Sequence, residues 1–440
     1  MRLPQNAPRF APWDLAPSRL PKVIHAVRSP CVHGRYLHWD ELRRRPPPAG
    51  LSHEEWWYGL AMQRSALARE LPLLDKDGQP FKYVLVDPIP ERLHEVDLGA
   101  GGKIAMPDQI TNPDTKDQYY VGSLIEEAVT SSQLEGATTT RQVAKEMLRA
   151  GRRPRDRSEQ MILNNFLTMK RIGELRREAM SKELIFELHR LVTDGTLDDL
   201  SAAGRFRRAS EQIVVGGDDD EIYHVPPPAE SLDERLESMC AFAKDGGEGG
   251  FVHPAIRSIV LHFWLAYDHP FVDGNGRTAR ALFYWSMLRH GYWLFEFISI
   301  SHMILKAPSQ YYRAFLHTET DANDLTYFIL YHAEIIRRAI EELHRYIERK
   351  TEELKLVEAE LKGVQFLNHR QRAFISHALR HPNHAYSIES HRKSWGVAYQ
   401  TARTDLLDLS DRGLLHKRQV GNRLLFTPAK DIRERLANLE

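Results

Sequence analysis

The twelve residues at 269–280 read His-Pro-Phe-Val-Asp-Gly-Asn-Gly-Arg-Thr-Ala-Arg. They follow the stretch 254–268 and run into the stretch 276–290, and in both stretches the apolar residues recur at helical spacing. A glycine-bearing loop that enters a helix presents unpaired backbone N–H groups and the positive end of the helix dipole. Gly274 and Gly276 permit the tight backbone and the close approach of a ligand. The stretch therefore predicts a helical fold with an anion site, for which phosphate is the natural occupant.

Four side chains of this stretch supply the chemistry that a nucleotide site needs. Arg277 and Arg280 lie three positions apart on the first turn of the second helix, and guanidinium groups match phosphate oxygens bidentately. Asp273 supplies a carboxylate that could hold Mg²⁺ against the phosphates, with Mn²⁺ as an alternative ion. His269 belongs to the residue type that titrates near neutrality and can accept a proton from an attacking hydroxyl. So many compatible groups in one loop favour a nucleotide site over a structural turn.

The same stretch, written His-x-Phe-x-Asp-Gly-Asn-Gly-Arg-x-x-Arg, resembles the full signature of the Fic family of the Fic/Doc superfamily. The resemblance extends over about residues 117–335. It implies a mainly α fold, in which a helical core carries a small β-hairpin. It also implies a protein adenylyltransferase that moves AMP from ATP to a Tyr, Thr or Ser hydroxyl of a target protein. His269 would deprotonate that hydroxyl, and Asp273 would bind the metal ion.

The resemblance also assigns the contacts to the nucleotide. Asn275 and the loop amides would hold the phosphates. Arg277 would steady the β-phosphate and Arg280 the γ-phosphate. Tyr311 or Tyr312 would line the adenosine pocket, although packing in an aromatic core explains either tyrosine equally well.

The segment 211–226 contains two short β-prone runs around a Gly-Asp turn, which predicts a hairpin. In the family that this chain resembles, such a hairpin is a flap that pairs with the main chain of the target. Doc-like relatives bind the nucleotide inverted and act as kinases, but their loop usually departs from Gly-Asn-Gly. Because this loop does not depart from it, AMP transfer is favoured.

Residues 119–136 read as a helix with one apolar side, ending in a second motif. Ser131, Glu135 and Gly136 match the Ser/Thr-x-x-x-Glu-Gly inhibitory motif of the same family. The Glu135 carboxylate would pair with Arg280 and so remove this arginine from the γ-phosphate. The sequence therefore predicts an enzyme that is held inactive by its own helix.

Outside a core at 106–335, three further regions are expected. Residues 1–105 are rich in prolines and aromatics, with a helix near 53–71, a β-like run at 83–86 and no chemistry that we can assign. Residues 336–362 predict a connecting helix. Residues 363–440 read helix, helix, helix, hairpin, as in a winged helix-turn-helix domain, and carry 13 Lys and Arg against 7 Asp and Glu. Both DNA and a docked protein suit such a domain.

The composition excludes some classes of protein. The 60 basic and 60 acidic residues cancel, so no overall field indicates a nucleic-acid or membrane partner. No run of 18 apolar residues and no export signal occurs, and we expect a cytoplasmic location. Two other functions stay open: a DNA-binding regulator that uses the core as a nucleotide sensor, and a hydrolase that removes AMP from modified proteins. A homodimer is compatible with the sequence.

Overall fold

Helix α11, Pro254–Asp268, is buried on nearly every side. Its proline stands in the first turn and the His253 ring accepts a hydrogen bond from the backbone N–H of Ala255, which together start the helix. A helix that is apolar all round must be enclosed by other elements. Here α12, Asn275–Arg289, packs along it, and α12 in turn contacts α6, α8 and α9. This pair forms the centre on which the site is built.

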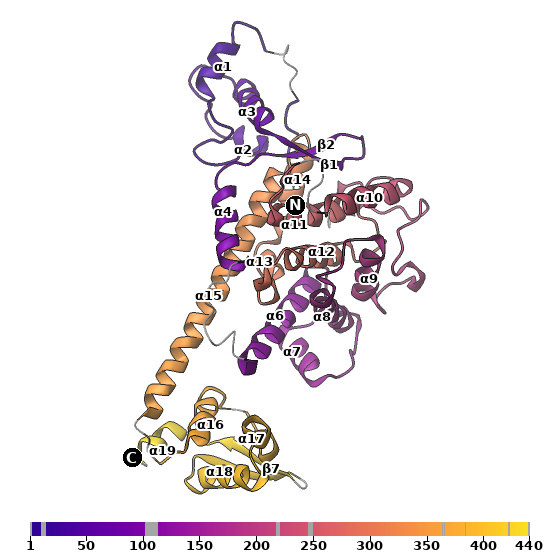
Figure 1. Cartoon of the computed structure of the whole chain (residues 1–440). Helices are drawn as coiled ribbons and strands as arrows, with labels where there is room; N and C mark the ends of the chain where they lie inside the picture. Colours follow the sequence, from indigo (N-terminus) through magenta and orange to yellow (C-terminus); the bar gives the residue numbers. More distant parts are fainter. Residues whose placement is uncertain are drawn as a thin grey trace. The chain divides into compact units, whose positions relative to one another are not determined.

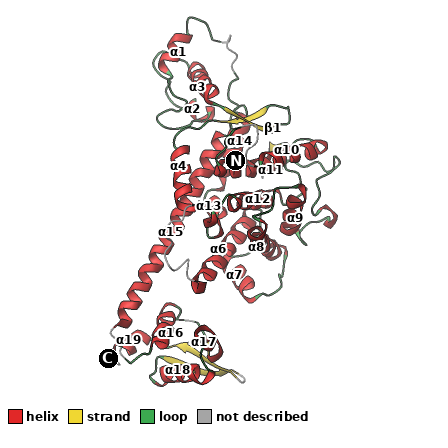
Figure 2. Cartoon of the chain, in the orientation of Figure 1, coloured by secondary structure: helices red, strands yellow, loops and turns green. Residues whose placement is uncertain are grey.

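The computed structural model describes residues 2–9, 15–101, 113–216, 221–244, 250–362, 364, 366–382, 384–420 and 423–438. The chain divides into two units, Met1–Leu343 and His344–Glu440 (Figure 1). Most elements are helices, as Figure 2 shows, so the prediction of a mainly α fold is confirmed. No helix within these ranges is both long and apolar enough to cross a membrane.

The helical core of the first unit lies between α6 and α15. Besides α11 and α12, it contains α6 Pro113–Leu134, α7 Arg141–Ala150, α8 Arg157–Leu175, α9 Lys182–Thr193, α10 Leu232–Phe242, α13 Ile300–Leu305, α14 Pro308–Thr320 and the first part, up to Leu343, of α15 Thr326–Lys362. Side-chain caps at Thr140, Asp156 and Ser181 accept backbone N–H groups at the starts of α7, α8 and α9. The hairpin predicted at 211–226 is present as β3 Val215–Gly216 paired antiparallel with β4 Ile222–His224. Residues 217–220, between these strands, lie outside the described ranges.

The N-terminal segment belongs to the same unit as the helical core. It consists of α1 Leu20–Ala26, α2 Trp39–Leu42, α3 His53–Leu67, β1 Arg69–Leu74, β2 Pro80–Tyr83, α4 Ile89–Val96 and a π-helical turn Asp97–Gly101. The predicted helix at 53–71 ends early because Leu71 and Leu73 alternate with exposed residues and pair as a strand with β2. The buried guanidinium of Arg64 donates to the carbonyl of Leu37 and to the hydroxyl of Tyr327 on α15, at 2.8 and 2.9 Å. This arginine therefore joins the N-terminal segment to the core.

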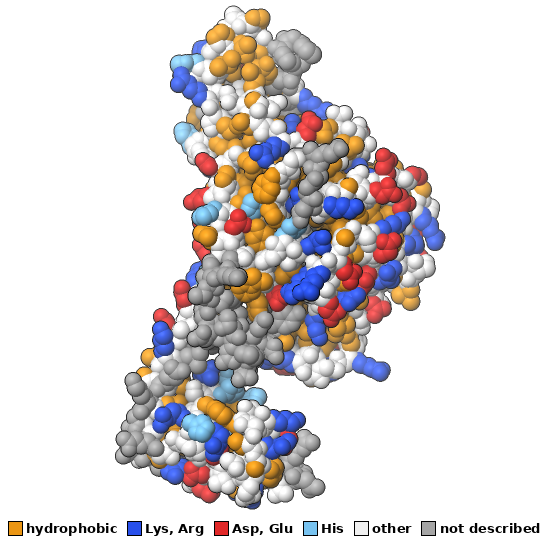
Figure 3. All heavy atoms as spheres, viewed as in Figure 1, with side chains coloured by type: hydrophobic (Ala, Val, Ile, Leu, Met, Phe, Trp, Pro, Cys, Tyr) orange, Lys and Arg blue, Asp and Glu red, His pale blue; other side chains and the backbone are white. Residues whose placement is uncertain are grey.

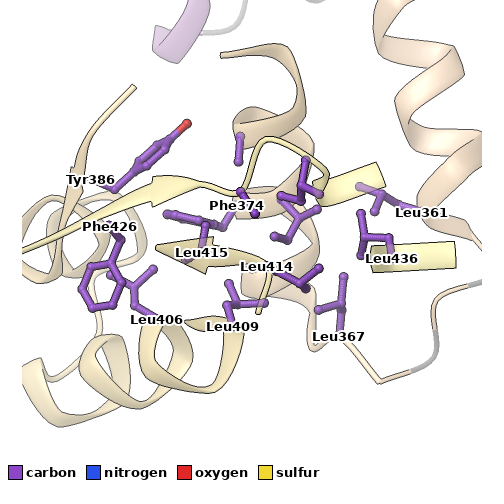
Figure 4. Packing of buried hydrophobic residues seen from close by; sticks show 14 of the residues in the cluster. Leu361, Leu367, Phe374, Tyr386, Leu406, Leu409, Leu414, Leu415, Phe426 and Leu436 are labelled. Atoms are coloured by element: carbon purple, nitrogen blue, oxygen red, sulfur yellow. The ribbon is translucent and has the colours of Figure 1, made fainter. Parts of the chain in front are cut away.

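The second unit has its own apolar core. Its elements are α16 His369–Arg380, β5 Tyr386–Ser387, α17 Ile388–Trp395, α18 Tyr399–Asp411, β6 Leu415–Val420, β7 Arg423–Pro428 and α19 Ile432–Asn438, with strand order β5-β7-β6. Three helices followed by a hairpin is the order that the sequence predicts for a winged helix. Figure 4 shows side chains such as Phe374, Leu406 and Phe426 meeting between the helices and the sheet. Leu361, from the end of α15, is part of this core.

Candidate active site

His269 follows the last residue of α11 and has a left-handed backbone, with φ of 44°. Its Nδ1 lies 3.3 Å from the carbonyl oxygen of Ala266, so Nδ1–H donates and Nε2 keeps a free lone pair. Burial lowers the pKa of His269 to about 4, which leaves the ring neutral near pH 7. Arg207 fixes the backbone by donating from Nε to the carbonyl of His269 at 2.9 Å. The imidazole is thus held as an unprotonated base.

The loop after His269 is closed by the side chain of Asn275. Its Oδ1 accepts the N–H of Phe271 at 2.9 Å, and its Nδ2 donates to the carbonyl of the same residue at 2.8 Å. The amide group that the family resemblance assigns to phosphate is therefore bound to the loop itself. The first backbone hydrogen bond of α12 runs from the N–H of Thr278 to the carbonyl of Gly274, at 2.9 Å. The N–H groups of residues 275–277 precede the helical ladder and can bind an anion.

A second histidine supports this loop from α9. The His189 ring stacks on Phe271, with 3.7 Å between the ring centroids. Its Nε2 donates to the carbonyl of Asp273 and its Nδ1 accepts the N–H of Gly204, both at 2.9 Å. Burial lowers the pKa of His189 to about 4, consistent with this neutral tautomer. The ring therefore ties the loop to the segment at Gly204.

Glu135 lies over the start of α12. Its Oε1 accepts from Nη2 of Arg280 at 2.9 Å, while Ser131 accepts from the same arginine through its hydroxyl at 2.8 Å and its carbonyl at 2.9 Å. Arg280 is buried, and burial by itself acts to lower the pKa of its guanidinium. The Glu135 carboxylate acts in the opposite direction, so the pKa of Arg280 is above its ordinary value. A Cβ built on Gly276 would overlap Oε1 of Glu135, so the carboxylate rests directly on the first turn of the helix.

The C-terminal end of α6 sets the position of this carboxylate. Gly136 has a φ of 89°, a left-handed conformation that glycine adopts without strain. The N–H of Ala137 then bonds the carbonyl of Ser132 at 3.0 Å, just beyond the end of the helix at Leu134, the residue before Glu135. The motif Ser131, Glu135, Gly136 thus places a hydroxyl and a carboxylate on the same guanidinium.

Asp273 is the exposed carboxylate of the loop. Its Oδ1 accepts the N–H of Gly274 at 2.5 Å, and its Oδ2 lies 3.5 Å from both Arg157 and Arg277. Its side chain is 41% exposed, so one carboxylate edge is accessible to an ion. Among the described residues, no group of three His, Cys, Asp or Glu side chains could hold a metal ion by itself. A magnesium ion here would need phosphate oxygens and water as further ligands, which is its usual preference.

Arg277 extends from α12 to a backbone carbonyl at the end of α9. Its side chain is 1% exposed and its Nη1 donates to the carbonyl of Val192 at 2.7 Å. Burial lowers the pKa of Arg277 below its ordinary value. In this conformation the guanidinium braces α12 against α9, and its contact with a phosphate stays a prediction.

The two tyrosines of α14 differ in burial. Tyr311 is buried, and its hydroxyl lies 3.0 Å from Nε2 of His262 within a cluster of aromatic rings. Tyr312 is 42% exposed. Burial raises the pKa of both tyrosines, and the Glu135 carboxylate adds to the increase for each, so exposure alone separates them. Core packing therefore explains Tyr311, and Tyr312 is the better placed of the two to meet a ligand.

Comparison with known proteins finds matches to the part of the chain that contains this site. The sequence model described as Fic/DOC family matches residues 179–287, which contain α9, the hairpin, α11 and most of α12. The chain carries a Fic/DOC family domain. A protein adenylyltransferase Fic from Nematostella vectensis is 36% identical over 117 residues, which are 26% of this chain and 24% of that protein. The corresponding protein of Drosophila grimshawi is 35% identical over 108 residues, 24% of this chain and 20% of that protein.

The Fic domain matches about a quarter of the length of these curated relatives, so their whole-protein activity does not transfer directly. Among solved structures, a Fic family protein from Desulfovibrio desulfuricans has a TM-score of 0.54 at 19% identity and covers 79% of this chain and 98% of that chain. This likeness shows the fold. The roles of the site residues must be argued from their geometry.

The sequence patterns did not single out His189. His189 is a buried polar residue among the apolar positions Ile185, Leu188 and Val192 of α9. The only sign of this role in the sequence is a histidine on the apolar face of a helix. This pattern does not indicate which loop the ring contacts. That contact depends on the packing of α9 against α12.

Proposed function

We propose that this protein transfers AMP from ATP to a hydroxyl side chain of a target protein. The observation that supports this most strongly is the neutral His269, whose Nε2 is free beside a helix start able to bind phosphate. His269 takes the proton of the attacking hydroxyl, whose oxygen then bonds the α-phosphorus of ATP. The bond from that phosphorus to the bridging oxygen breaks, and pyrophosphate leaves. The names of the matched relatives, protein adenylyltransferase Fic, support the same reaction.

The remaining residues bind and orient the nucleotide. The N–H groups of residues 275–277 would receive the phosphates, and Asp273 would hold Mg²⁺. Bound Mg²⁺ would neutralise part of the negative charge on the phosphates. Arg280 would bind the γ-phosphate once it is free of Glu135, and Tyr312 would contact the adenosine. The hairpin β3–β4 would receive the main chain of the target by strand pairing.

The same geometry supports inhibition by α6. Glu135 occupies the helix start where a phosphate would bind, and it holds Arg280 with the help of Ser131. A hydrogen bond to a charged group contributes about 1.5–3 kcal/mol, which is roughly a ten- to hundredfold effect on the bound population. The resting chain would therefore bind ATP with its γ-phosphate displaced.

The test is Glu135→Gly, which removes the carboxylate and leaves Arg280 in place. We expect incorporation of labelled AMP into the chain itself and into lysate proteins to rise roughly ten- to hundredfold. Glu178→Gly, at an exposed glutamate after α8, is the matched control and should leave incorporation unchanged. The double variant Glu135→Gly, His269→Ala should incorporate none. Incorporation that is equal in the parent chain and in Glu135→Gly would refute the inhibitory contact.

Adding a previously AMPylated protein to the same reactions separates transfer from removal. If the Glu135→Gly chain releases AMP from that protein and adds none to any acceptor, hydrolysis replaces transfer as its function. Exchange of ATP for UTP or GTP in the same assay establishes the base preference.

A second function, DNA binding by the second unit, is favoured by its unpaired cations. Lys393, Arg403, Lys417 and Arg418 are exposed and form no ion pair with any residue in the described part of the chain. They lie on α17, on α18, which corresponds to a recognition helix, and on the hairpin strand β6.

A gel shift with duplex DNA at several salt concentrations tests this function. Lys417→Glu with Arg418→Glu should weaken binding and lower the salt slope by about two. Arg433→Glu, at an arginine paired with Glu360, is the control. Absence of a salt-dependent shift in the parent chain would leave protein docking as the role of this unit.

A further inference from the structure

The segment from α7 to the start of α8 is strongly basic in a chain whose net charge is zero. Residues 141–157 contain 7 Lys and Arg against 2 Asp and Glu. Elsewhere, on the face drawn in Figure 3, basic and acidic side chains are interspersed over the first unit. We call Lys145, Arg149, Arg153 and Arg155 the basic strip. Lys145 and Arg149 are exposed one turn apart on α7, so they share a face.

The cations of the strip form no ion pair with a carboxylate in the described part of the chain. Burial and then the charges of Arg149 and Arg141 lower the pKa of Lys145, while the Glu126 carboxylate acts to raise it. Arg153 and Arg155 are exposed and form no ion pair within the described ranges. Other arginines of the first unit, Arg171 and Arg205 among them, form ion pairs with a glutamate or an aspartate. The strip therefore has cations available for an outside partner.

The loop that carries the strip is held rigidly. Arg152 turns inward, and both of its terminal nitrogens bond the carboxylate of Glu159 at 2.6 Å. The same carboxylate accepts the N–H of Arg155 at 2.8 Å, and Asp156 caps α8 by accepting the N–H of Glu159 at 2.8 Å. Because this backbone is fixed, the side chains of Arg153 and Arg155 project from a preorganised surface.

The strip leads to the catalytic loop. Arg157, two residues after Arg155, places Nη2 3.5 Å from Oδ2 of Asp273. A surface depression beside it is lined by Pro154, Arg155 and Gln160 on one side and by residues 195–198 on the other. A partner that follows the strip would thus reach the signature loop.

We propose that the basic strip docks an acidic segment of the protein that receives AMP, and so delivers its hydroxyl to His269. This inference rests on the proposed function and adds the chemical class of the target. Glu146, Asp156 and Asp198 lie among or beside the cations. A polynucleotide carries a negative charge at every phosphate, so some of its phosphates would be repelled by these carboxylates. The acidic side chains of a peptide can be spaced so that they contact only the cations.

The test uses the Glu135→Gly chain and a random copolymer of glutamate and tyrosine as acceptor, with a copolymer of lysine and tyrosine for comparison. Arg153→Glu with Arg155→Glu should raise KM for the acidic copolymer about tenfold and change kcat by less than about twofold. The pair Arg153→Lys, Arg155→Lys keeps the charge and should retain most of the affinity. Lys170→Glu with Arg177→Glu, exposed on and just after α8, is the matched control. KM for ATP should be the same in all variants, which shows that they are folded.

A binding arm makes the inference independent of catalysis. The His269→Ala chain is titrated with fluorescent acidic copolymer, and the affinity should fall about tenfold with the same charge reversal. If the chain transfers AMP to nothing, the proposed function fails while this arm still decides the role of the strip. Equal affinity in the reversed and control variants would overturn the inference. The inference would also be overturned if the charge reversal abolished binding of single-stranded polynucleotide and left binding of the acidic copolymer unchanged. A rise in KM for ATP alone, with KM for the copolymer unchanged, would overturn it as well.

Discussion

The imidazole of His269 and the carboxylate of Glu135 act on the same reaction from different environments. His269 is enclosed and bonded through Nδ1 to the Ala266 carbonyl, so it is neutral and can accept a proton without further activation. Glu135 is partly exposed and ionically paired with Arg280, at 2.9 Å. In the proposed function, inhibition would therefore act on the position of the phosphates, while the base would already be competent.

The lowered pKa of His269 predicts the acid side of the pH profile. A histidine with a pKa of about 4 is about nine-tenths neutral at pH 5, whereas one at the ordinary 6.5 is only about 3% neutral there. We expect kcat/KM of the Glu135→Gly chain for the acceptor to fall little between pH 7.5 and pH 5. Removing Glu135 also removes a charge that raises this pKa, which acts in the same direction. A fall of more than tenfold across this range, with the chain still folded, would show that the base titrates near its ordinary pKa.

At the scale of elements, two helix ends meet to form the site. The C-terminal end of α6 brings Ser131 and Glu135 to the N-terminal end of α12, where the unpaired N–H groups and the helix dipole favour a negative charge. Under the proposed function, a phosphate of ATP and the Glu135 carboxylate would compete for this helix start for the same reason. Inhibition would be relieved by any event that moves the end of α6 away from α12.

Helix α15 also serves two parts of the molecule. Its beginning contains Tyr327, which binds Arg64, and its end contributes Val357 and Leu361 to the core of the second unit. The sequence predicted a separate connecting helix at 336–362. The structure divides into units within this helix, at Leu343 and His344.

Leu361→Ala tests whether the end of α15 stabilises the second unit. Leu361 is 1% exposed, and truncation of such a side chain costs about 2–5 kcal/mol through lost burial and a residual cavity. Calorimetry should show a lower transition temperature for the second unit and an unchanged transition for the first. Leu356→Ala, at a side chain that is 66% exposed, should change neither by more than about 0.5 kcal/mol. Equal shifts in both transitions would mean that the two units unfold together.

Much of the helical framework could be predicted from periodicity. The stretches 254–268 and 276–290 correspond to α11 and α12 within one residue, because long apolar patterns bounded by Pro and Gly fix both ends. The strand β1 could not be separated from the preceding helix, because Leu71 and Leu73 fit either pattern over so few residues. Its pairing with β2, across the turn at 75–79, decides between them.

For the molecule as a whole, buried histidines link folding to pH. Several of them lie in the first unit, and burial lowers the pKa of each well below 6.5: His38, His189, His262, His269, His317 and His332. As pH falls below 6.5, the unfolded chain binds protons that the folded chain does not. The free energy of unfolding is therefore largest above pH 6.5 and decreases as pH falls.

We expect the melting temperature of the first unit to fall between pH 7 and pH 5. Each such histidine contributes up to about 1.4 kcal/mol per pH unit in this window, before offsetting terms. Scanning calorimetry across this range measures the slope. His317→Gln, which removes one titrating ring stacked on His38, should make the slope shallower. A melting temperature that is constant or rises toward pH 5 would contradict this account.

The sequence by itself determined the signature at 269–280 and the mainly helical fold, and it predicted an inhibitory role for the motif at Ser131 to Gly136. Each of these is local, because a loop motif and the spacing of apolar residues along a helix depend only on residues that are close together in the sequence. Only the tertiary structure decided that Glu135 rests on α12, that Asn275 binds its own loop and that His189 supports it. These contacts join residues far apart in the chain, and they depend on how α6, α9 and α12 pack, which no local pattern specifies.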